Sequence, residues 1–222
     1  MVTPGEYLDL LDARLPGLVA GAHLHGSRVL DDVVFDSDLD VVVELAAAAD
    51  VPAVDGVDVS VVMAGDLSRP VSSVTPLFGE VTPVLWQQLR TVGQTVRGTR
   101  PACPVTAAEV AAYCRANLVS YWKPQLDAGR AALRTVDQRI PVFREAVLWV
   151  GLGPARLWHT IRTGEIVSKS RAGVLAAEQW PDLGPLLLDL VEARRDAAVV
   201  LTPDHLAAAL GLGDRVLADV TA

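Results

Sequence analysis

The sequence lacks long apolar stretches and grouped cations. No uninterrupted apolar run reaches the roughly 18 residues that a membrane-spanning helix needs, so we expect no membrane partner. The formal net charge is −8, whereas binding to phosphate backbones requires clustered cations, so we expect no nucleic-acid partner. The opening "MVTPGEYLDLLDARL" carries early acids and no cationic stretch, which argues against a secretory signal. We therefore expect a cytoplasmic protein.

Cysteine and lysine are both scarce. Cys103 and Cys114 show no CxxC or Cys/His spacing, so we predict neither a zinc site nor a disulfide. Of the 19 Lys and Arg residues, only Lys123 and Lys169 are lysines. Lys169 ends the Gly-bounded segment "TGEIVSK" ahead of a predicted helix, where a lysine is suited to contact a phosphate. The alternative for Lys169 is an ordinary surface lysine.

What is present is a strong apolar pattern, since 51% of the residues are hydrophobic. Up to about residue 103 the periodicity alternates between helical and extended. We predict helices at 4–14 and 82–92, and strands within 17–27, 39–45, 57–65 and 93–101. From residue 106 the pattern is helical throughout, and we interpret "GLGP" at 151–154 as a helix break. The predicted fold class is α+β, with a mixed-sheet N-terminal domain (1–103) and an all-helical domain (104–222).

One predicted strand carries acids at alternate positions, in "SDLDVVVEL". Alternate residues of a strand point to the same side, so Asp38 and Asp40 should project together while Leu39 and Val41 face the other way. Neighbouring carboxylates repel each other unless a cation compensates, and Mg²⁺ prefers carboxylate oxygens. We therefore predict a Mg²⁺ site, with a solvated strand face as the alternative.

Two neighbouring segments support the metal interpretation. Gly26 and Ser27 follow the first predicted strand, where a glycine allows close backbone approach and a hydroxyl can bind phosphate oxygens. Ser37 offers a second hydroxyl directly ahead of Asp38. In "VDVSVV", Asp58 alternates with valines and would join the first two carboxylates if its strand lay beside residues 39–45. We expect the acids to be exposed on one sheet face and the valines to bury the other.

The same residues carry a resemblance to a known family. The stretch "LHGSRVLDDVVFDSDLDVVV" resembles the signature of the polymerase-β-type nucleotidyltransferase superfamily, and most closely that of the streptomycin/spectinomycin adenylyltransferases. The later stretch "ARLWHTIRTGEIVSKSRAGVLAAEQWPD" is similar to part of the helical domain of those enzymes. The similar segments are residues 5–62, 82–101 and 155–195.

The resemblance implies a role for each matching residue. Gly26, Ser27 and Ser37 would bind the triphosphate of ATP, and Lys169 would reach it from the helical domain. Asp38 and Asp40 would bind Mg²⁺. Asp58 stands where the family has a catalytic glutamate, so it would act as the base and possibly as a third metal ligand.

These implications lead to one main hypothesis and two alternatives. The main hypothesis is an enzyme that moves AMP from ATP to a hydroxyl of a small, cationic, aminoglycoside-like molecule and releases pyrophosphate. The first alternative is a regulatory or antitoxin-type nucleotidyltransferase that modifies a partner protein. The second is a binding module without catalysis, which the presence of all three carboxylates disfavours.

Overall fold

The computed structural model describes residues 2–34, 37–135 and 143–221, and the chain divides into two compact units. These units are Met1–Glu109 and Val110–Ala222. We expected a boundary after residue 103, ahead of the first helix of the second half, whereas this division falls inside that helix. The helical pattern predicted from residue 106 onward includes residues 136–142, which lie outside the described ranges.

The first unit contains both strands and helices, with bounds as follows. They are α1 (Pro4–Arg14), β1 (Val19–Leu24), η1 (Gly26–Leu30), β2 (Leu39–Leu45), β3 (Val57–Met63), η2 (Asp66–Ser68), η3 (Val71–Ser73), α2 (Pro83–Thr91) and β4 (Gln94–Arg97). The helix α1 begins with a capping box, because the Thr3 hydroxyl accepts from the backbone of Glu6 while the Glu6 carboxylate accepts from that of Thr3. The predicted strands and helices of this half are all present.

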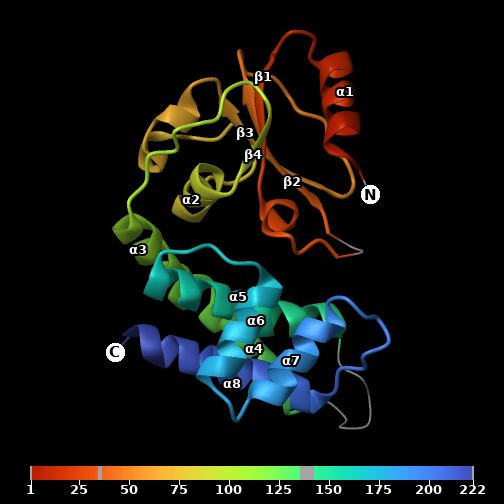
Figure 1. The fold of residues 1–222 in the computed structure, drawn as a ribbon, viewed down its shortest axis with the longest axis vertical. Coiled ribbons are helices and arrows are strands. Elements are labelled where there is room, and N and C mark those ends of the chain that lie inside the picture. The colour runs from red at the N-terminus through yellow and green to blue at the C-terminus, as the bar shows by residue number, and fades with distance from the viewer. Residues whose placement is uncertain (1, 35–36, 136–142, 222) are drawn as a thin grey trace. The chain divides into compact units, whose positions relative to one another are not determined.

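The four strands form one mixed sheet in the order β3-β2-β1-β4. β1 runs antiparallel to both β2 and β4, and β2 runs parallel to β3. Figure 1 shows α1 and α2 on opposite sides of this sheet. A core of leucine and valine side chains, including Leu39, Val41 and Val43, packs with Tyr7 and Leu11 of α1. The mixed sheet confirms the predicted fold class for this half.

The second face of the sheet differs from our expectation. We expected it to be an exposed acidic face, but Val42 and Val62, which alternation turns away from α1, are fully buried. Trp86 and Leu89 of α2 are buried as well. A sheet this small gains stability by burying apolar side chains on both faces, which leaves room for acids where β2 and β3 begin and for Glu44, whose carboxylate is paired with His23 and Gly65.

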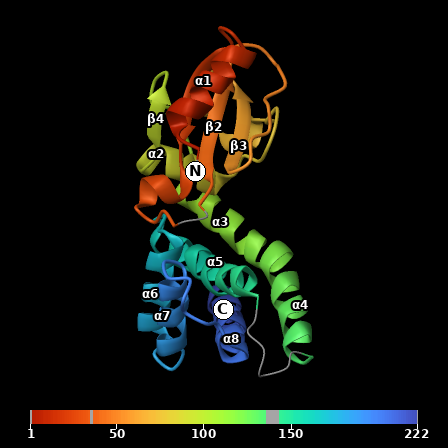
Figure 2. The same ribbon diagram turned by 90° about the vertical axis from the view of Figure 1, so that its right-hand side faces the viewer.

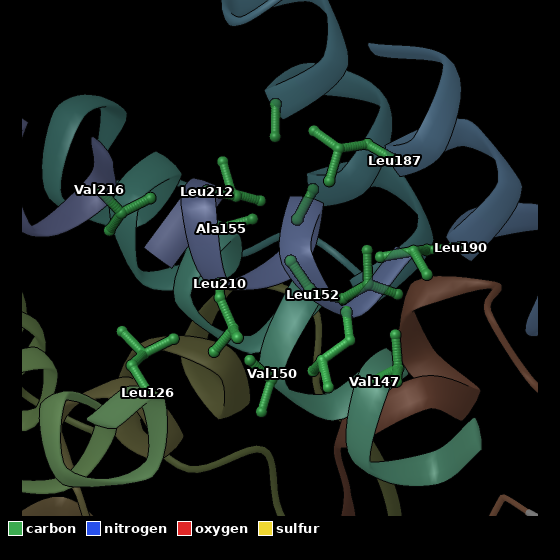
Figure 3. Close-up of a cluster of buried hydrophobic side chains, with 14 of the residues drawn as sticks. Leu126, Val147, Val150, Leu152, Ala155, Leu187, Leu190, Leu210, Leu212 and Val216 are labelled. Atoms are coloured by element: carbon green, nitrogen blue, oxygen red, sulfur yellow. The ribbon is translucent and has the colours of Figure 1, made fainter. Parts of the chain in front are cut away.

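In the part of the second unit that the structure describes, all regular elements are helices, as predicted. Its elements are α3 (Ala107–Asn117), the π-helical turn η4 (Leu118–Trp122), α4 (Lys123–Leu133), α5 (Arg144–Thr163), α6 (Lys169–Gln179), α7 (Gly184–Ala193) and α8 (Pro203–Thr221). α5 packs against α6 and α8, and Figure 2 shows α6 beside α7. Figure 3 shows the aliphatic core that these helices enclose, including Leu152, Leu190 and Leu210.

The predicted break at 151–154 is wrong, because α5 continues through Pro154. Proline in a helix interior removes one backbone hydrogen bond, at a cost of about 3 kcal/mol. The structure offsets this cost by packing, since residues 150–155 are all buried. A Cβ at Gly151 would lie 2.5 Å from Leu190, and one at Gly153 would overlap the Trp122 ring. Both glycines therefore serve close helix packing rather than helix termination.

Within the described ranges, no helix is long and apolar enough to cross a membrane.

Candidate functional site

The candidate site lies at one end of the sheet of the first unit. In the parallel pairing of β2 with β3, Asp40 is the register partner of Asp58. On the other side of β2, the backbone N–H of His25 donates to the carbonyl of Asp40 at 3.1 Å, directly before Gly26. The start of β2, the start of β3 and the end of β1 therefore meet here. The chain brings Asp58, Asp40 and Gly26 together from three separate segments.

Gly26 and Asp40 are in close contact. Gly26 has a φ of 69°, in the left-handed region that disfavours other residues, and a Cβ there would overlap the Asp40 carboxylate. The backbone N–H of Ser27 points to Asp40 Oδ2 at 3.4 Å. The Ser27 Oγ atom is buried and has no hydrogen-bond partner. A buried hydroxyl without a partner is uncommon, and it lies beside an N–H that is already directed at an anion.

Asp38, Asp40 and Asp58 differ in exposure. Asp40 is half-buried, whereas Asp38 and Asp58 are exposed. Among the residues that the structure describes, no group of three or more His, Cys, Asp or Glu side chains is gathered closely enough to hold a metal ion. The sheet thus aligns Asp40 with Asp58 and sets Asp38 just ahead of β2. The three carboxylates do not form a converged ligand set.

Ser37 lies in the turn before β2. Its Oγ accepts the backbone N–H of Val34 at 2.9 Å, and its own N–H donates to the Val34 carbonyl at 3.0 Å. The hydroxyl oxygen is therefore engaged with Val34, while the hydroxyl hydrogen can still be donated to a further acceptor. Ser37 remains a predicted phosphate contact.

Lys169 belongs to the second unit, where it is the first residue of α6. Ser168 caps this helix by accepting the N–H of Arg171 at 3.1 Å. The Nε of Arg156 donates to the Val167 carbonyl at 3.2 Å, and the Nε of Arg194 donates to Ser170 Oγ at 3.2 Å. The first turn of α6 is therefore surrounded by cationic side chains, at a helix end that itself favours anions.

Two residues near the site were missed by sequence reasoning. Gln88 of α2 is buried, and its Nε2 lies 3.5 Å from the carbonyl oxygen of Gly26. A glutamine on the same helix side as Leu85 and Leu89, in "VLWQQL", is the signal that could have identified it. Glu80 is exposed, and its carbonyl accepts the Ser60 hydroxyl at 2.7 Å. Ser60 follows Asp58 by two residues on the same face of β3, so Glu80 lies near the third carboxylate.

Glu44 lies deeper on the same face of β2 and has a structural role. Its Oε2 lies 3.2 Å from Nε2 of the buried His23, and its Oε1 accepts the N–H of Gly65 at 3.1 Å. The hydrogen bond with His23 is the largest effect on the pKa of Glu44 and lowers it. Burial acts in the opposite direction and raises the pKa, whereas the hydrogen bond from the Gly65 N–H lowers it further. This carboxylate therefore contributes stability at neutral pH, and the contribution is lost as pH falls through its lowered pKa.

We expect Glu44→Gln to reduce the loss of folding stability in acid. The wild-type carboxyl is ionised when folded and takes up a proton more readily when unfolded, so acid favours the unfolded chain. Below the ordinary glutamate pKa, the free energy of unfolding should fall less steeply in the variant. Denaturant unfolding at pH 7, 5 and 3.5 measures this, with Asp50→Asn as a control at an exposed carboxylate beyond β2. Equal pH profiles for wild type and Glu44→Gln would contradict the assignment.

We expect Gly26→Ala to destabilise the first unit by about 2–5 kcal/mol. A left-handed alanine costs about 1–2 kcal/mol, and displacing the Asp40 carboxylate adds about 1–3 kcal/mol. Gly56→Ala is the matched control, because Gly56 has a φ of 76° but nothing within 4 Å of an added Cβ. Urea denaturation should therefore show a larger loss at Gly26 than at Gly56. Equal losses would mean that the Asp40 side chain can move away from the added Cβ without lowering the free energy of unfolding.

Comparisons with protein-family models and with curated protein sequences each give no match. Among solved structures, the chain is similar to spectinomycin adenyltransferase AAD(9) from Enterococcus faecialis, determined with ATP and spectinomycin. The TM-score is 0.61 at 12% sequence identity, and the match covers 96% of this chain and 99% of that one. Along nearly its whole length, this chain therefore has the nucleotidyltransferase fold seen in spectinomycin adenyltransferase.

Proposed function

We propose that the chain is a nucleotidyltransferase that moves AMP from ATP to a hydroxyl group of a small molecule and releases pyrophosphate. The observation that carries this proposal is the register pairing of Asp40 with Asp58 beside the Gly26–Ser27 turn. Two carboxylates and a backbone anion position at one sheet end are what an in-line displacement at phosphorus requires.

Mg²⁺ would be held by Asp38 and Asp40, with Asp58 as a further ligand. The donor set fits this ion, because Mg²⁺ prefers carboxylate oxygens and commonly takes one or two from the protein and the rest from water and phosphate. When bound, the ion neutralises the charge of the triphosphate. Without a cation, the neighbouring carboxylates of Asp40 and Asp58 repel each other. A bound Mg²⁺ would offset this repulsion, which is consistent with such a site.

Gly26, Ser27 and Ser37 would bind the triphosphate. The N–H of Ser27 is directed at a carboxylate oxygen, and a phosphate oxygen is an acceptor of the same kind. The buried Ser27 Oγ without a partner would gain one in the complex. Gly26 leaves room for the Asp40 side chain, so the acidic group and the anion position can lie side by side.

Asp58 would act as the general base. Its exposed carboxylate would take the proton of the acceptor hydroxyl while the hydroxyl oxygen forms a bond to the α-phosphorus. The bond between the α-phosphorus and the bridging oxygen breaks, and pyrophosphate leaves with that oxygen. The proton then passes from Asp58 to solvent.

Lys169 would provide a cation for the triphosphate from the second unit. We expect Lys169→Ala to weaken ATP binding by about 1–3 kcal/mol, the range for losing a charged hydrogen bond. Lys123→Ala is the matched control, since Lys123 is the other lysine and forms an exposed ion pair with Asp127. Calorimetry of ATP binding measures both variants, and an unchanged affinity in Lys169→Ala would make Lys169 a surface lysine.

The acceptor is proposed to be a cationic, aminoglycoside-like molecule in the cytoplasm, where ATP is available. The similar solved structure holds spectinomycin together with ATP. The net charge of −8 and the exposed acids Asp58 and Glu80 would attract ammonium groups. The net negative charge does not favour nucleic acid as the acceptor.

Incubation with ATP labelled at the α-phosphate tests this function. The protein is mixed with labelled ATP, Mg²⁺ and panels of aminoglycosides, aminocyclitols and proteins, and the label is followed by chromatography. Label on a small molecule, with loss of transfer on chelation of Mg²⁺, is the expected result. Label on a protein would favour the regulatory or antitoxin-type alternative. No transfer to any acceptor, together with no ATP binding by calorimetry, would contradict the proposal.

A further inference from the structure

Gln88 is a buried polar residue that connects α2 to the Gly26–Ser27 turn. Gln88 is only 4% exposed, and Leu85 and Leu89 of the same helix are buried as well. A buried amide without a partner would lose the hydrogen bonds that it makes in water, so its contacts in the fold are informative. The contact that the Gln88 Nε2 makes is with the carbonyl oxygen of Gly26 at 3.5 Å.

That carbonyl belongs to the same peptide group as the N–H of Ser27. A trans peptide is planar, with its C=O and N–H pointing in opposite directions. The N–H end of this group points to Asp40 Oδ2 at 3.4 Å, while the C=O end points to Gln88. One peptide group is therefore held at both ends, from β2 and from α2.

The glycine in this peptide makes such a restraint useful. Gly26 adopts a φ of 69°, and a glycine has few steric barriers to other backbone conformations. Rotation of the Gly26–Ser27 peptide would turn the Ser27 N–H away from Asp40. A hydrogen bond on the carbonyl oxygen opposes that rotation without contacting the anion position itself. Gln88 is thus placed to control the direction of an N–H that it does not touch.

We propose that Gln88 is a positioning residue that keeps the Ser27 N–H directed at the anion position beside Asp40. The role in ATP binding rests on the proposed function, whereas the restraint on the peptide does not. In the free protein Asp40 is the acceptor at this N–H, and an oxygen of the triphosphate is the acceptor in the complex. In the free protein and in the complex alike, the hydrogen bond from Gln88 to the carbonyl of Gly26 would hold the orientation of this peptide group.

The restraint can be measured in the free protein by nuclear magnetic resonance. Residues 26–27 are the only Gly-Ser pair in the sequence, so ¹³C-carbonyl glycine combined with ¹⁵N-serine gives one correlated signal, from this peptide. Gln88→Met keeps the length and volume of the side chain but removes the donor. Gln87→Met is the matched control, because Gln87 is adjacent on α2 and half-buried, and its side-chain oxygen accepts from Arg90.

We expect the Gly26 carbonyl signal to move upfield in Gln88→Met and to stay in place in Gln87→Met. Exchange of the Ser27 amide hydrogen should become roughly 3–10-fold faster, as for the loss of one hydrogen bond. An unchanged signal and exchange rate in Gln88→Met would overturn the proposed restraint. Should Gln88→Met fail to fold, Gln88→Leu takes its place, since its side chain also lacks a donor.

Binding of a non-hydrolysable ATP analogue with Mg²⁺ tests the functional part separately. Calorimetry should show an affinity roughly 3–10-fold weaker in Gln88→Met and unchanged in Gln87→Met. A shifted Gly26 signal with unchanged affinity would overturn the role of Gln88 in ATP binding. If the wild-type protein fails to bind the analogue, the proposed function fails, and the carbonyl signal still decides whether Gln88 holds the peptide.

Discussion

Asp40→Asn should lower the rate of AMP transfer by more than about 10³-fold while leaving the fold intact. The substitution removes the charge that would hold Mg²⁺, and a bound metal ion contributes several kcal/mol of charge stabilisation in such a transition state. A loss of about 4 kcal/mol corresponds to about 10³-fold, since each 1.36 kcal/mol is a factor of ten. Single-turnover rates with saturating ATP and acceptor measure the loss.

Binding measurements make this prediction specific to the charge on Asp40. Without Mg²⁺, the wild-type carboxylate competes with phosphate for the Ser27 N–H and repels the triphosphate, so Asp40→Asn should bind metal-free ATP at least as tightly. With Mg²⁺ the order should reverse, because only the wild type gains affinity from the ion. Asp50→Asn, the same charge change in the exposed loop after β2, should follow wild type in both conditions.

Asp40→Asn should also leave the thermal unfolding temperature unchanged or raise it. Asp40 and Asp58 are register partners on parallel strands, so removing one charge relieves repulsion in the metal-free protein. Asp38→Asn should likewise abolish transfer, since Asp38 is proposed as a second ligand of the same ion. Transfer at wild-type rate in either variant would exclude that residue from the metal site.

If Asp58 acts chiefly as the general base, Asp58→Asn should lower turnover by about 10²–10⁴-fold with nearly unchanged binding of Mg²⁺ and ATP. This range is the usual contribution of a positioned general base. The expectation differs from that for Asp40, because Asp58 comes from β3 and is exposed, whereas Asp40 is half-buried against Gly26. Calorimetry of ATP binding beside single-turnover rates separates the two roles. If affinity and turnover fall together, Asp58 is chiefly a metal ligand.

Asp58→Glu is the companion variant, since it restores the residue of the resembled adenylyltransferases and lengthens the side chain by one methylene. Partial activity in Asp58→Glu, beside the loss in Asp58→Asn, would show that a carboxylate at this position is what the reaction needs. Full activity in Asp58→Asn would remove Asp58 from the site. Asp55, in the turn before β3, and Glu80, whose backbone contacts Ser60, would then be the acids to test.

For the first unit, the sequence alone was sufficient for the helices α1 and α2, the four strands and their order along the chain. Helical and alternating periodicities depend on neighbours within one element, so the pattern around α1, β2 and β3 is local information. The same holds for Asp38 and Asp40, whose shared direction follows from strand alternation. The Gly-Ser and Asp-x-Asp spacing further indicated a nucleotidyltransferase, and the structure confirms that fold.

The packing of α5 shows why local rules fail where tertiary contacts are strong. Gly151, Gly153 and Pro154 read as a helix break, because each is unfavourable in an isolated helix. The break is absent because Trp122 and Leu190, distant in sequence, occupy the space that side chains at the two glycines would need. Residues 150–155 are all buried, and the stability gained from this burial outweighs the local preference of glycine and proline against a helix.

The geometry of the candidate site was decided by the tertiary structure. The pairing of Asp40 with Asp58 depends on strand order, and that order comes from long-range burial of both sheet faces rather than from any residue near the acids. The contact of Gly26 with Asp40 joins the start of η1 to β2, and the contact of Gln88 with Gly26 spans most of the first unit. Local sequence determined which groups were available, because side-chain chemistry and periodicity are properties of the chain. Their distances were set by packing, which depends on the whole fold.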